Sequence, residues 1–322
     1  MDKSTRIYVA GHRGLAGSAL LRRLRAAGYD NLLTRTHAEL DLVDAGTVGR
    51  FFAEQRPQVV LLAAAKVGGI LANNTYPADF IRENLAIQTN VIHEAWRAGV
   101  TKLLFLGSSC IYPRDCPQPM KEDYLLTGPL EPTNRPYAVA KIAGIEMCWS
   151  YNRQYGTRYL CAMPTNLYGP GDNYNLNTSH VLAALIRKFH EAKTRGERTV
   201  TVWGSGKPRR EFLHSDDMAD ACIRLLETSD ADIQRRLPQG RPPLINIGCG
   251  KDLTIAELAE RVRETVGSDA AIVYDRSKPD GTPQKLLDIT LIRSFGWEPK
   301  ISLSAGLRSS YASFLDETRA AA

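Results

Sequence analysis

The chain has 322 residues, of which 43% are hydrophobic and 24% charged, with a formal net charge of +6. This composition indicates a globular protein with a large apolar core and excludes a disordered chain. The longest apolar stretch, residues 59–65, is too short to cross a bilayer, so we expect no membrane contact. The six cysteines lack zinc-binding spacing, which favours reduced thiols, a cytoplasmic protein and no bound metal. The sequence has no basic stripe interleaved with aromatic residues, so we expect no nucleic-acid partner.

Short apolar runs alternate with amphipathic stretches over the first half of the chain. We expect strands at residues 6–10, 31–36, 59–63, 103–107 and 158–163. We expect helices between them at residues 15–27, 45–54, 77–98 and 137–155. This alternation predicts an α/β fold with a doubly wound parallel sheet of the Rossmann type.

The pattern changes after Pro164. A loop rich in glycine and asparagine at residues 169–177 leads to an expected helix, 179–195, and later elements include a strand at 244–247. A Thr254/Glu257 capping box opens another helix, which ends near Gly267. We therefore expect a dinucleotide-binding domain at 1–168 and a smaller, partly interleaved substrate lobe at 169–322. The segments 205–225 and 244–250 are expected to return to the first domain.

A glycine loop directly follows the first expected strand. Gly11, Gly14 and Gly17 are spaced three residues apart and open the first helix. Such a turn lets backbone N–H groups and the helix N-terminus meet a pyrophosphate without Cβ clashes. In this position the loop predicts a bound dinucleotide, although a tight turn alone would also use glycine.

The residues at the end of the second expected strand indicate which cofactor the chain binds. An NAD-binding unit usually has an acid there, which holds the ribose 2′-hydroxyl. This chain has Arg35 instead, and Arg13 lies inside the glycine loop. Two arginines suit a 2′-phosphate, so we predict NADP, with NADPH as the hydride donor. Further cofactor contacts are expected at Asp41, Leu42, Ala63 and Ala64.

A tyrosine and a lysine follow a Ser-Ser-Cys sequence that closes an apolar run. Tyr137 and Lys141 are one helical turn apart, so their side chains share a face. Free tyrosine has a pKa of about 10, and a neighbouring lysine cation favours the phenolate and eases proton transfer. Alternate residues of an extended segment face the same way, so we expect Ser108 and Cys110 to point into one pocket. These residues predict a carbonyl-reducing site with an additional acid/base group.

Several longer sequence strings carry a resemblance. They include A-K-V-G-G-I at 65–70, S-S-C-I-Y-P at 108–113, R-E-F-L-H at 210–214 and K-P-D-G-T-P at 278–283. Over nearly its full length the chain resembles the extended short-chain dehydrogenase/reductases that act on nucleotide sugars. Within them it resembles the GDP-L-fucose synthase family, whose members are bifunctional epimerase/reductases.

The resemblance implies a reaction. The family converts GDP-4-keto-6-deoxy-D-mannose to GDP-L-fucose by epimerisation at C3 and C5, followed by NADPH-dependent reduction at C4. Protons at C3 and C5 lie α to the ketone, so their removal gives an enolate, which Ser108 and Tyr137 can stabilise. Cys110 resembles the family's base and His180 its acid. Ordinary thiols and imidazoles, with pKa values of about 8.5 and 6.5, exchange protons near neutrality.

The resemblance also implies contacts for both ligands. Cofactor contacts are implied at Leu15, Tyr137, Lys141, Pro164, Asn166, Leu167 and His180. Contacts with a GDP-sugar are implied at Val181, Leu185, Lys188, Trp203, Arg210 and Lys285. Family members often have arginine where this chain has Lys188, and lysine lacks the bidentate fork. The sequence therefore leaves open whether Arg187 or Lys188 meets the diphosphate. A homodimer, paired through the helices around 77–98 and 137–155, is also implied.

Two other functions remain open at this point. One is an NAD-dependent nucleotide-sugar 4-epimerase, which recycles its cofactor and needs no Cys/His pair; Arg35 and Cys110 argue against it. The other is a non-catalytic NADP-sensing protein, and such proteins generally lose the Tyr/Lys pair that is intact here. Continued substrate-dependent oxidation of NADPH separates the reductase from both.

Overall fold

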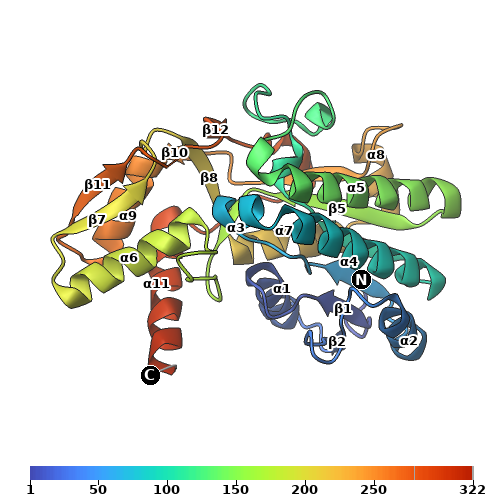
Figure 1. The fold of residues 1–322 in the computed structure, drawn as a ribbon. Coiled ribbons are helices and arrows are strands. Elements are labelled where there is room, and N and C mark those ends of the chain that lie inside the picture. Colours follow the sequence, from blue (N-terminus) through green and yellow to red (C-terminus); the bar gives the residue numbers. More distant parts are fainter. Residues whose placement is uncertain (279, 321–322) are drawn as a thin grey trace.

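The larger part of the fold is a six-stranded parallel sheet, as the sequence predicts (Figure 1). The computed structural model describes residues 1–278 and 280–320. The strand order is β2-β1-β3-β4-β5-β9, and all five pairings are parallel. The strands are β1 (Ile7–Ala10), β2 (Leu32–Leu33), β3 (Val59–Leu62), β4 (Lys102–Leu106), β5 (Arg158–Pro164) and β9 (Leu244–Ile247). Most of their residues are buried, as expected for a parallel sheet covered by helices.

Two groups of helices pack against this sheet. In one group α1 contacts α7, and in the other α4 contacts both α2 and α5. The bounds are α1 (Leu15–Ala26), α2 (Ala45–Gln55), α4 (Pro77–Arg97), α5 (Arg135–Tyr155) and α7 (Ser215–Glu227). Pro77 begins α4 and Gly99 follows its end with a φ of +76°, which matches the predicted start and stop signals.

The smaller part of the fold carries its own hydrophobic core, in which Leu182, Phe189, Leu258 and Leu307 are buried. Figure 1 shows it beside the large sheet, with α6, α9 and the pair β7/β11 at its outer end. Its helices are α6 (Val181–Arg195), α9 (Ile255–Val266) and α11 (Leu303–Ala320). Its strands are β6 (Asn166–Tyr168), β7 (Thr199–Trp203), β8 (Arg209–His214), β10 (Asp252–Thr254), β11 (Ala271–Asp275) and β12 (Gln284–Lys285).

Short elements complete the described chain. They are α3 (Ile70–Thr75), α8 (Asp230–Arg236), α10 (Thr290–Ser294), and the 3₁₀ turns η1 (Ser109–Ile111), η2 (Glu122–Tyr124) and η3 (Pro132–Asn134). The segment 205–225 divides between the two parts, because β8 pairs with β10 and β12 whereas α7 packs on α1. No described helix combines the length and hydropathy that a membrane crossing requires.

The second strand is shorter than the sequence predicts. The prediction covered residues 31–36, but β2 has two residues. The chain turns at Thr36, whose backbone N–H donates to the Glu39 carboxylate (2.7 Å) and whose carbonyl accepts from Leu40 N (3.0 Å). These local bonds satisfy the backbone without a sheet partner, so they end the strand early. The predicted capping box of α9 is confirmed, with Thr254 and Glu257 each bonding the other's backbone N–H.

Candidate active site

The glycine loop leaves no room for side chains where β1 meets α1. Gly11 has a φ of +82°, and a Cβ there would lie 2.7 Å from Ala64 N. A Cβ on Gly17 would lie 2.1 Å from the Gly11 carbonyl oxygen. Gly14 precedes α1, and no side chain caps that helix. The first-turn N–H groups therefore remain available to an anion, and the loop fits a dinucleotide pyrophosphate.

The two predicted arginines lie at the edge of this loop. Arg13 is exposed, and the Arg35 guanidinium lies 5.5 Å from the Phe51 ring centroid while donating to the Thr34 carbonyl (2.7 Å). The only acid within this turn, Glu39, is tied to Thr36, and this bond together with both arginines lowers its pKa. No carboxylate occupies the place that would bind a ribose 2′-hydroxyl at the end of β2.

The other predicted cofactor residues line the same end of the sheet. Leu15 begins α1, Ala63 and Ala64 follow β3, Pro164 ends β5, and Asn166 and Leu167 lie in β6. The Asn166 amide is already engaged, because its Nδ2 donates to the Glu211 carbonyl (2.8 Å). Asp41 accepts a hydrogen bond from Val43 N (2.9 Å). Leu42 is buried in the main core.

The Ser-Ser-Cys segment is not extended, which corrects the geometry expected from the sequence. Ser108 is extended, but residues 109–111 form a 3₁₀ turn in which the Ser108 hydroxyl accepts from Cys110 N (3.3 Å). The parallel strand ends at Leu106, and the backbone closes a local hydrogen bond instead of continuing a ladder. Burial raises the pKa of Tyr137, and the neighbouring Ser108 side chain opposes this shift, so the turn keeps these two predicted residues close together.

Tyr137 and Lys141 lie on one face of α5, as their spacing predicts. The Tyr137 ring meets Phe80 edge to face, with centroids 6.4 Å apart. Lys141 is 3% exposed, and its Nζ donates to the Leu106 carbonyl (2.8 Å) and lies 5.8 Å from the Tyr137 ring centroid. Burial raises the pKa of Tyr137 and lowers the pKa of Lys141 to about 7.

The buried lysine predicts a cost in stability. At pH below about 7 both folded and unfolded chains carry the Lys141 proton, and the folded state bears the full desolvation cost. Between pH 7 and the unfolded value of about 10.4 the unfolded state binds more protons, so stability rises with pH. We expect Lys141→Met to raise the free energy of unfolding at pH 6 by on the order of 2 kcal/mol, after allowing for the lost bond to Leu106. Urea titrations at pH 6 and pH 9.5 measure this, and a gain as large at pH 9.5 would contradict it.

Cys110 meets two nitrogen groups from distant parts of the chain. Asn134 Nδ2 lies 3.4 Å from the Cys110 sulfur, and Lys285 Nζ lies 3.7 Å from it. His180 immediately precedes α6 and is exposed in the absence of ligands. Desolvation by the surrounding chain, and then the positive charge of Lys285, lower the pKa of His180. Lys285 therefore contacts one of the two residues predicted to transfer protons and lowers the pKa of the other.

The loop that carries His180 is tied to the loop that follows β3. Gly69 N donates to the Thr178 carbonyl (3.0 Å), and a Cβ on Gly69 would lie 2.8 Å from the Ser179 carbonyl oxygen. Only glycine permits this approach without a shift of the backbone. Gly69 thus ties the segment immediately before His180 to the loop that follows β3.

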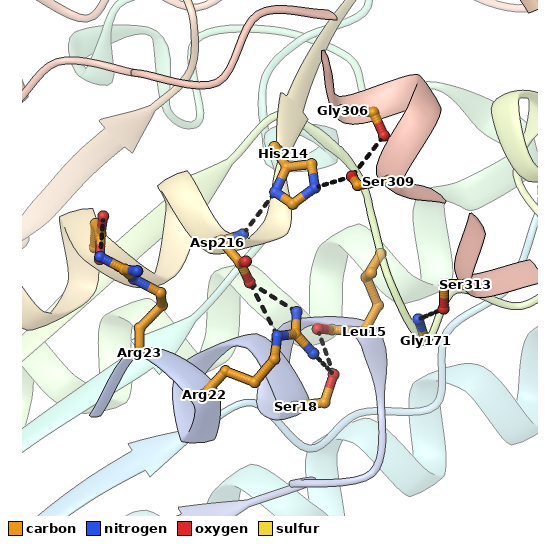
Figure 2. Close-up of polar contacts among 11 residues, drawn as sticks. Leu15, Ser18, Arg22, Arg23, Gly171, His214, Asp216, Gly306, Ser309 and Ser313 are labelled. Carbon is orange, nitrogen blue, oxygen red and sulfur yellow. Dashed lines mark hydrogen bonds and ion pairs between the residues drawn. The ribbon is translucent and has the colours of Figure 1, made fainter. Parts of the chain in front are cut away.

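A polar network that includes residues of α1 joins the two parts of the fold (Figure 2). Arg22 of α1 pairs with Asp216 of α7 at 2.7 Å and donates to the Ser18 hydroxyl (3.2 Å). The buried ring of His214 accepts from Asp216 N through Nδ1 (3.2 Å), so its Nε2 carries the proton toward the Ser309 hydroxyl (3.1 Å). α11 is thereby fastened to the start of α7, and through it to α1.

Lys188 and Trp203 form the predicted nucleotide side of the site. The Lys188 ammonium lies 5.3 Å from the Trp203 ring centroid and donates to the Thr201 carbonyl (2.8 Å). Arg187 bonds Glu191 (2.7 Å) and the Tyr174 carbonyl instead. Of the two basic residues left open by the sequence, Lys188 is therefore the one beside Trp203. Burial lowers the pKa of Lys188.

Arg210 and Lys285 are paired neighbours on β8 and β12. Arg210 donates to the Arg209 and Asp280 carbonyls, and burial lowers its pKa. Val181 begins α6 and is partly buried. Leu185, for which the resemblance implies a contact with the GDP-sugar, is 2% exposed and packs within the smaller core.

Three residues near the site are absent from the sequence-based set. Asn134 contacts Cys110, and Lys278 Nζ lies 5.6 Å from the Trp203 ring centroid. Glu211 is fully buried and accepts from Gly250 N (2.6 Å) and Leu287 N (3.0 Å), which fixes the chain beside Lys285. Glu211 stands between Arg210 and Phe212 in a strand of mixed polarity, so no local pattern signals its burial, and an asparagine before a helix indicates only a cap.

Comparison with known proteins places this geometry in a family. GDP-L-fucose synthase of Escherichia coli is 55% identical over 97% of each chain. GDP-L-fucose synthase 1 of Arabidopsis thaliana is 56% identical over 98% of this chain and 94% of its own. A GDP-D-glycero-L-gluco-heptose synthase of Campylobacter jejuni, solved in the presence of NADPH, is 39% identical, with a TM-score of 0.91 over 98% and 99% of the chains. The model of the NAD dependent epimerase/dehydratase family matches residues 7–248. The chain belongs to the NAD dependent epimerase/dehydratase family.

Proposed function

We propose that this enzyme converts GDP-4-keto-6-deoxy-D-mannose to GDP-L-fucose by C3 and C5 epimerisation, followed by NADPH-dependent reduction at C4. The observation that carries the proposal is the convergence of two kinds of group at one sheet edge. Ser108, Tyr137 and Lys141 suit ketone reduction, and Cys110 lies beside the Ser108 hydroxyl with Lys285 near both it and His180. The likeness to GDP-L-fucose synthases at 55–56% identity supports the same substrate.

Epimerisation depends on Cys110 and His180. Cys110 removes the proton from C3 or C5, and electron density moves onto the C4 oxygen. The Ser108 and Tyr137 hydroxyls donate to that oxygen, which stabilises the enolate. His180 returns a proton to the opposite face, and C4 regains its carbonyl. Lys285 compensates negative charge on the Cys110 sulfur at 3.7 Å.

Reduction uses the same oxygen contacts. Bound NADPH supplies a hydride to C4. Tyr137 gives its proton to the C4 oxygen as charge develops there. Lys141 lies on the same helical face and, when charged, lowers the cost of forming the phenolate. Because the phenol is buried and its pKa is raised, a cation beside it is needed for proton transfer at neutral pH.

Arg13 and Arg35 support NADP as the cofactor. The glycine loop and Leu15 of α1 would hold the pyrophosphate at the uncapped helix start. Arg35 follows β2, where an NAD-specific chain has an acid, and Arg13 lies in the glycine loop. Charge-assisted bonds from both guanidinium groups to a 2′-phosphate would favour NADP.

The arginines predict a measurable cofactor preference. We expect the unmodified protein to bind NADPH more tightly than NADH. Replacing Arg13 and Arg35 together with alanine removes two charge-assisted bonds, which weakens NADPH by roughly 30-fold to 1,000-fold, about 2–4 kcal/mol, and leaves NADH nearly unchanged. Fluorescence titration measures both affinities. Arg25→Ala, at an exposed position in the last turn of α1, is the matched control. Equal loss for both cofactors would contradict the assignment.

Basic residues of the smaller part would hold the GDP moiety. Lys188 and Arg210 supply positive charge for the diphosphate, and Trp203, with 48% exposure, offers a ring face for stacking. Val181 contributes apolar surface near the base. Lys285, for which the resemblance implies a place near the diphosphate and the sugar, has its ammonium 3.7 Å from the Cys110 sulfur. We assign it to the sugar and the proton transfers.

A homodimer and a cytoplasmic location complete the proposal. α4 and α5 lie side by side and carry a surface group of aromatic rings, in which Trp96 stacks on Tyr155 at 4.2 Å. Tyr155 and Val139 are exposed on α5, which suits pairing of two subunits through these helices. All six cysteines are free thiols, which suits a reducing compartment.

Sustained turnover tests the proposed function. With GDP-4-keto-6-deoxymannose present, NADPH should be oxidised over many turnovers, and the product should co-elute with GDP-L-fucose in chromatography. A 4-epimerase that recycles bound NAD would consume no NADPH, and a cofactor sensor would form no product. Either result would overturn the proposal.

A further inference from the structure

Asn134 contacts the sulfur that is proposed to act as the base. Its Nδ2 donates to Cys110 Sγ at 3.4 Å, and Lys285 Nζ reaches the same sulfur at 3.7 Å. The two donors come from different parts of the fold, η3 and β12. A sulfur atom accepts hydrogen bonds well only as a thiolate, so two donors directed at one sulfur favour its ionised form.

The Asn134 side chain is not needed to begin α5. Asparagine is a favoured helix cap, yet this one makes no side-chain bond to the helix backbone. Its backbone N–H is satisfied by the Glu131 carbonyl (3.3 Å). The amide is therefore available to donate a hydrogen bond to the Cys110 sulfur, and replacement of Asn134 removes no capping bond.

The second atom of the same amide has no partner. Asn134 Oδ1 is buried, and no group in the described chain donates to it. Buried acceptors are nearly always satisfied, and an unsatisfied one next to a reactive sulfur points to a donor that arrives with the ligand. A hydroxyl group of a hexose is such a donor.

We propose that Asn134 is a positioning residue for proton transfer: with Lys285 it donates to the Cys110 sulfur and stabilises the thiolate when it forms, and its Oδ1 binds a hydroxyl of the sugar. The first half concerns the protein alone, whereas the second rests on the proposed function. Lys285, Arg210 and Tyr137 interact with this sulfur. Glu131 interacts in turn with Arg210, and His180 with Lys285. Asn134 adds a neutral donor to them, so its removal leaves the net charge of the site unchanged.

Alkylation tests the first half without any substrate. The full-length protein is treated with iodoacetamide from pH 5 to pH 10, and modification of Cys110 is followed on its peptide by mass spectrometry. In Asn134→Ala we expect the pH of half-maximal alkylation to rise by about one unit, because the thiolate loses a donor. Asn134→Asp, which replaces the donor with an anion, should raise it further. The peptide of Cys249 is the internal control, and Thr133→Ala, whose hydroxyl contacts Glu131, is the matched variant. Overlapping curves for Asn134→Ala and the unmodified protein would overturn this half.

Kinetics with GDP-4-keto-6-deoxymannose test the second half. Asn134→Ala loses both donor and acceptor, so KM should rise severalfold and deuterium exchange at C3 and C5 should move to higher pH. Asn134→Asp keeps an acceptor, so its KM should stay near that of the unmodified protein while kcat falls. An unchanged KM in Asn134→Ala would overturn the hydroxyl contact. Absence of exchange in the unmodified protein would instead refute the proposed function, and the alkylation result would stand independently.

Discussion

Replacement of Tyr137 by phenylalanine should lower the rate of C4 reduction by about 10²-fold to 10⁴-fold, because the C4 oxygen loses its proton donor. The substitution removes only the hydroxyl from a ring packed against Phe80, so the fold should survive. Single-turnover oxidation of NADPH measures the chemical step without product release. Circular dichroism and NADPH titration establish that the variant is folded and binds cofactor.

A second tyrosine on the same helix provides the control. Tyr155 lies at the end of α5 and stacks on Trp96, so Tyr155→Phe should reduce the ketone at the normal rate. Exchange at C3 and C5 should fall less in Tyr137→Phe than reduction does, because the Ser108 hydroxyl still donates to the enolate oxygen. Near-normal reduction by a folded Tyr137→Phe protein would refute the assignment of Tyr137.

Replacement of Cys110 by serine should abolish solvent exchange at C3 and C5, with a loss of at least about 10³-fold. Serine keeps the shape of the side chain, but its hydroxyl does not ionise near neutral pH, so Asn134 and Lys285 surround no base. The variant should still bind NADPH and slowly reduce the unepimerised ketone, which would give a 6-deoxy sugar of another configuration. NMR of the sugar after incubation in heavy water measures both outcomes.

Cys116→Ser is the matched control for this change, since Cys116 is a partly buried free thiol in the loop that follows η1. It should exchange and epimerise normally. If Cys110→Ser also exchanged at the rate of the unmodified protein, Cys110 would be a packing residue beside a reductase site.

The sequence predicted the larger sheet well because its signals are local. The apolar run at 244–247 coincides with β9, and Pro77 and Gly99 bracket α4. Gly11 could be assigned to a close backbone approach from its place between a strand and a helix, and the structure has a φ of +82° there. Tyr137 and Lys141 needed only helical spacing to be placed on one face.

The rest depends on contacts between distant residues. Lys285 lies on a two-residue strand and is 175 residues from Cys110 in the sequence, so no local pattern indicates their contact. The turn after Ser108 replaced the expected extended segment because a side-chain bond to Cys110 N competed with the strand. Leu185 has the ordinary spacing of an amphipathic helix, so only packing reveals that it faces the core. The sequence did not point to Asn134, because an asparagine before a helix is ordinarily explained as a helix cap.

One experiment tests the central claim that a single pocket performs both chemistries. The unmodified protein is incubated with GDP-4-keto-6-deoxy-D-mannose and NADPH in heavy water, and the product is analysed by NMR. The proposal predicts GDP-L-fucose with deuterium at C3 and C5, protium at C4, and one NADPH oxidised for each product molecule. A reduced product that retains protium at C3 and C5 would show that the enzyme is a C4 reductase only, and the epimerase assignment of Cys110 and His180 would be wrong.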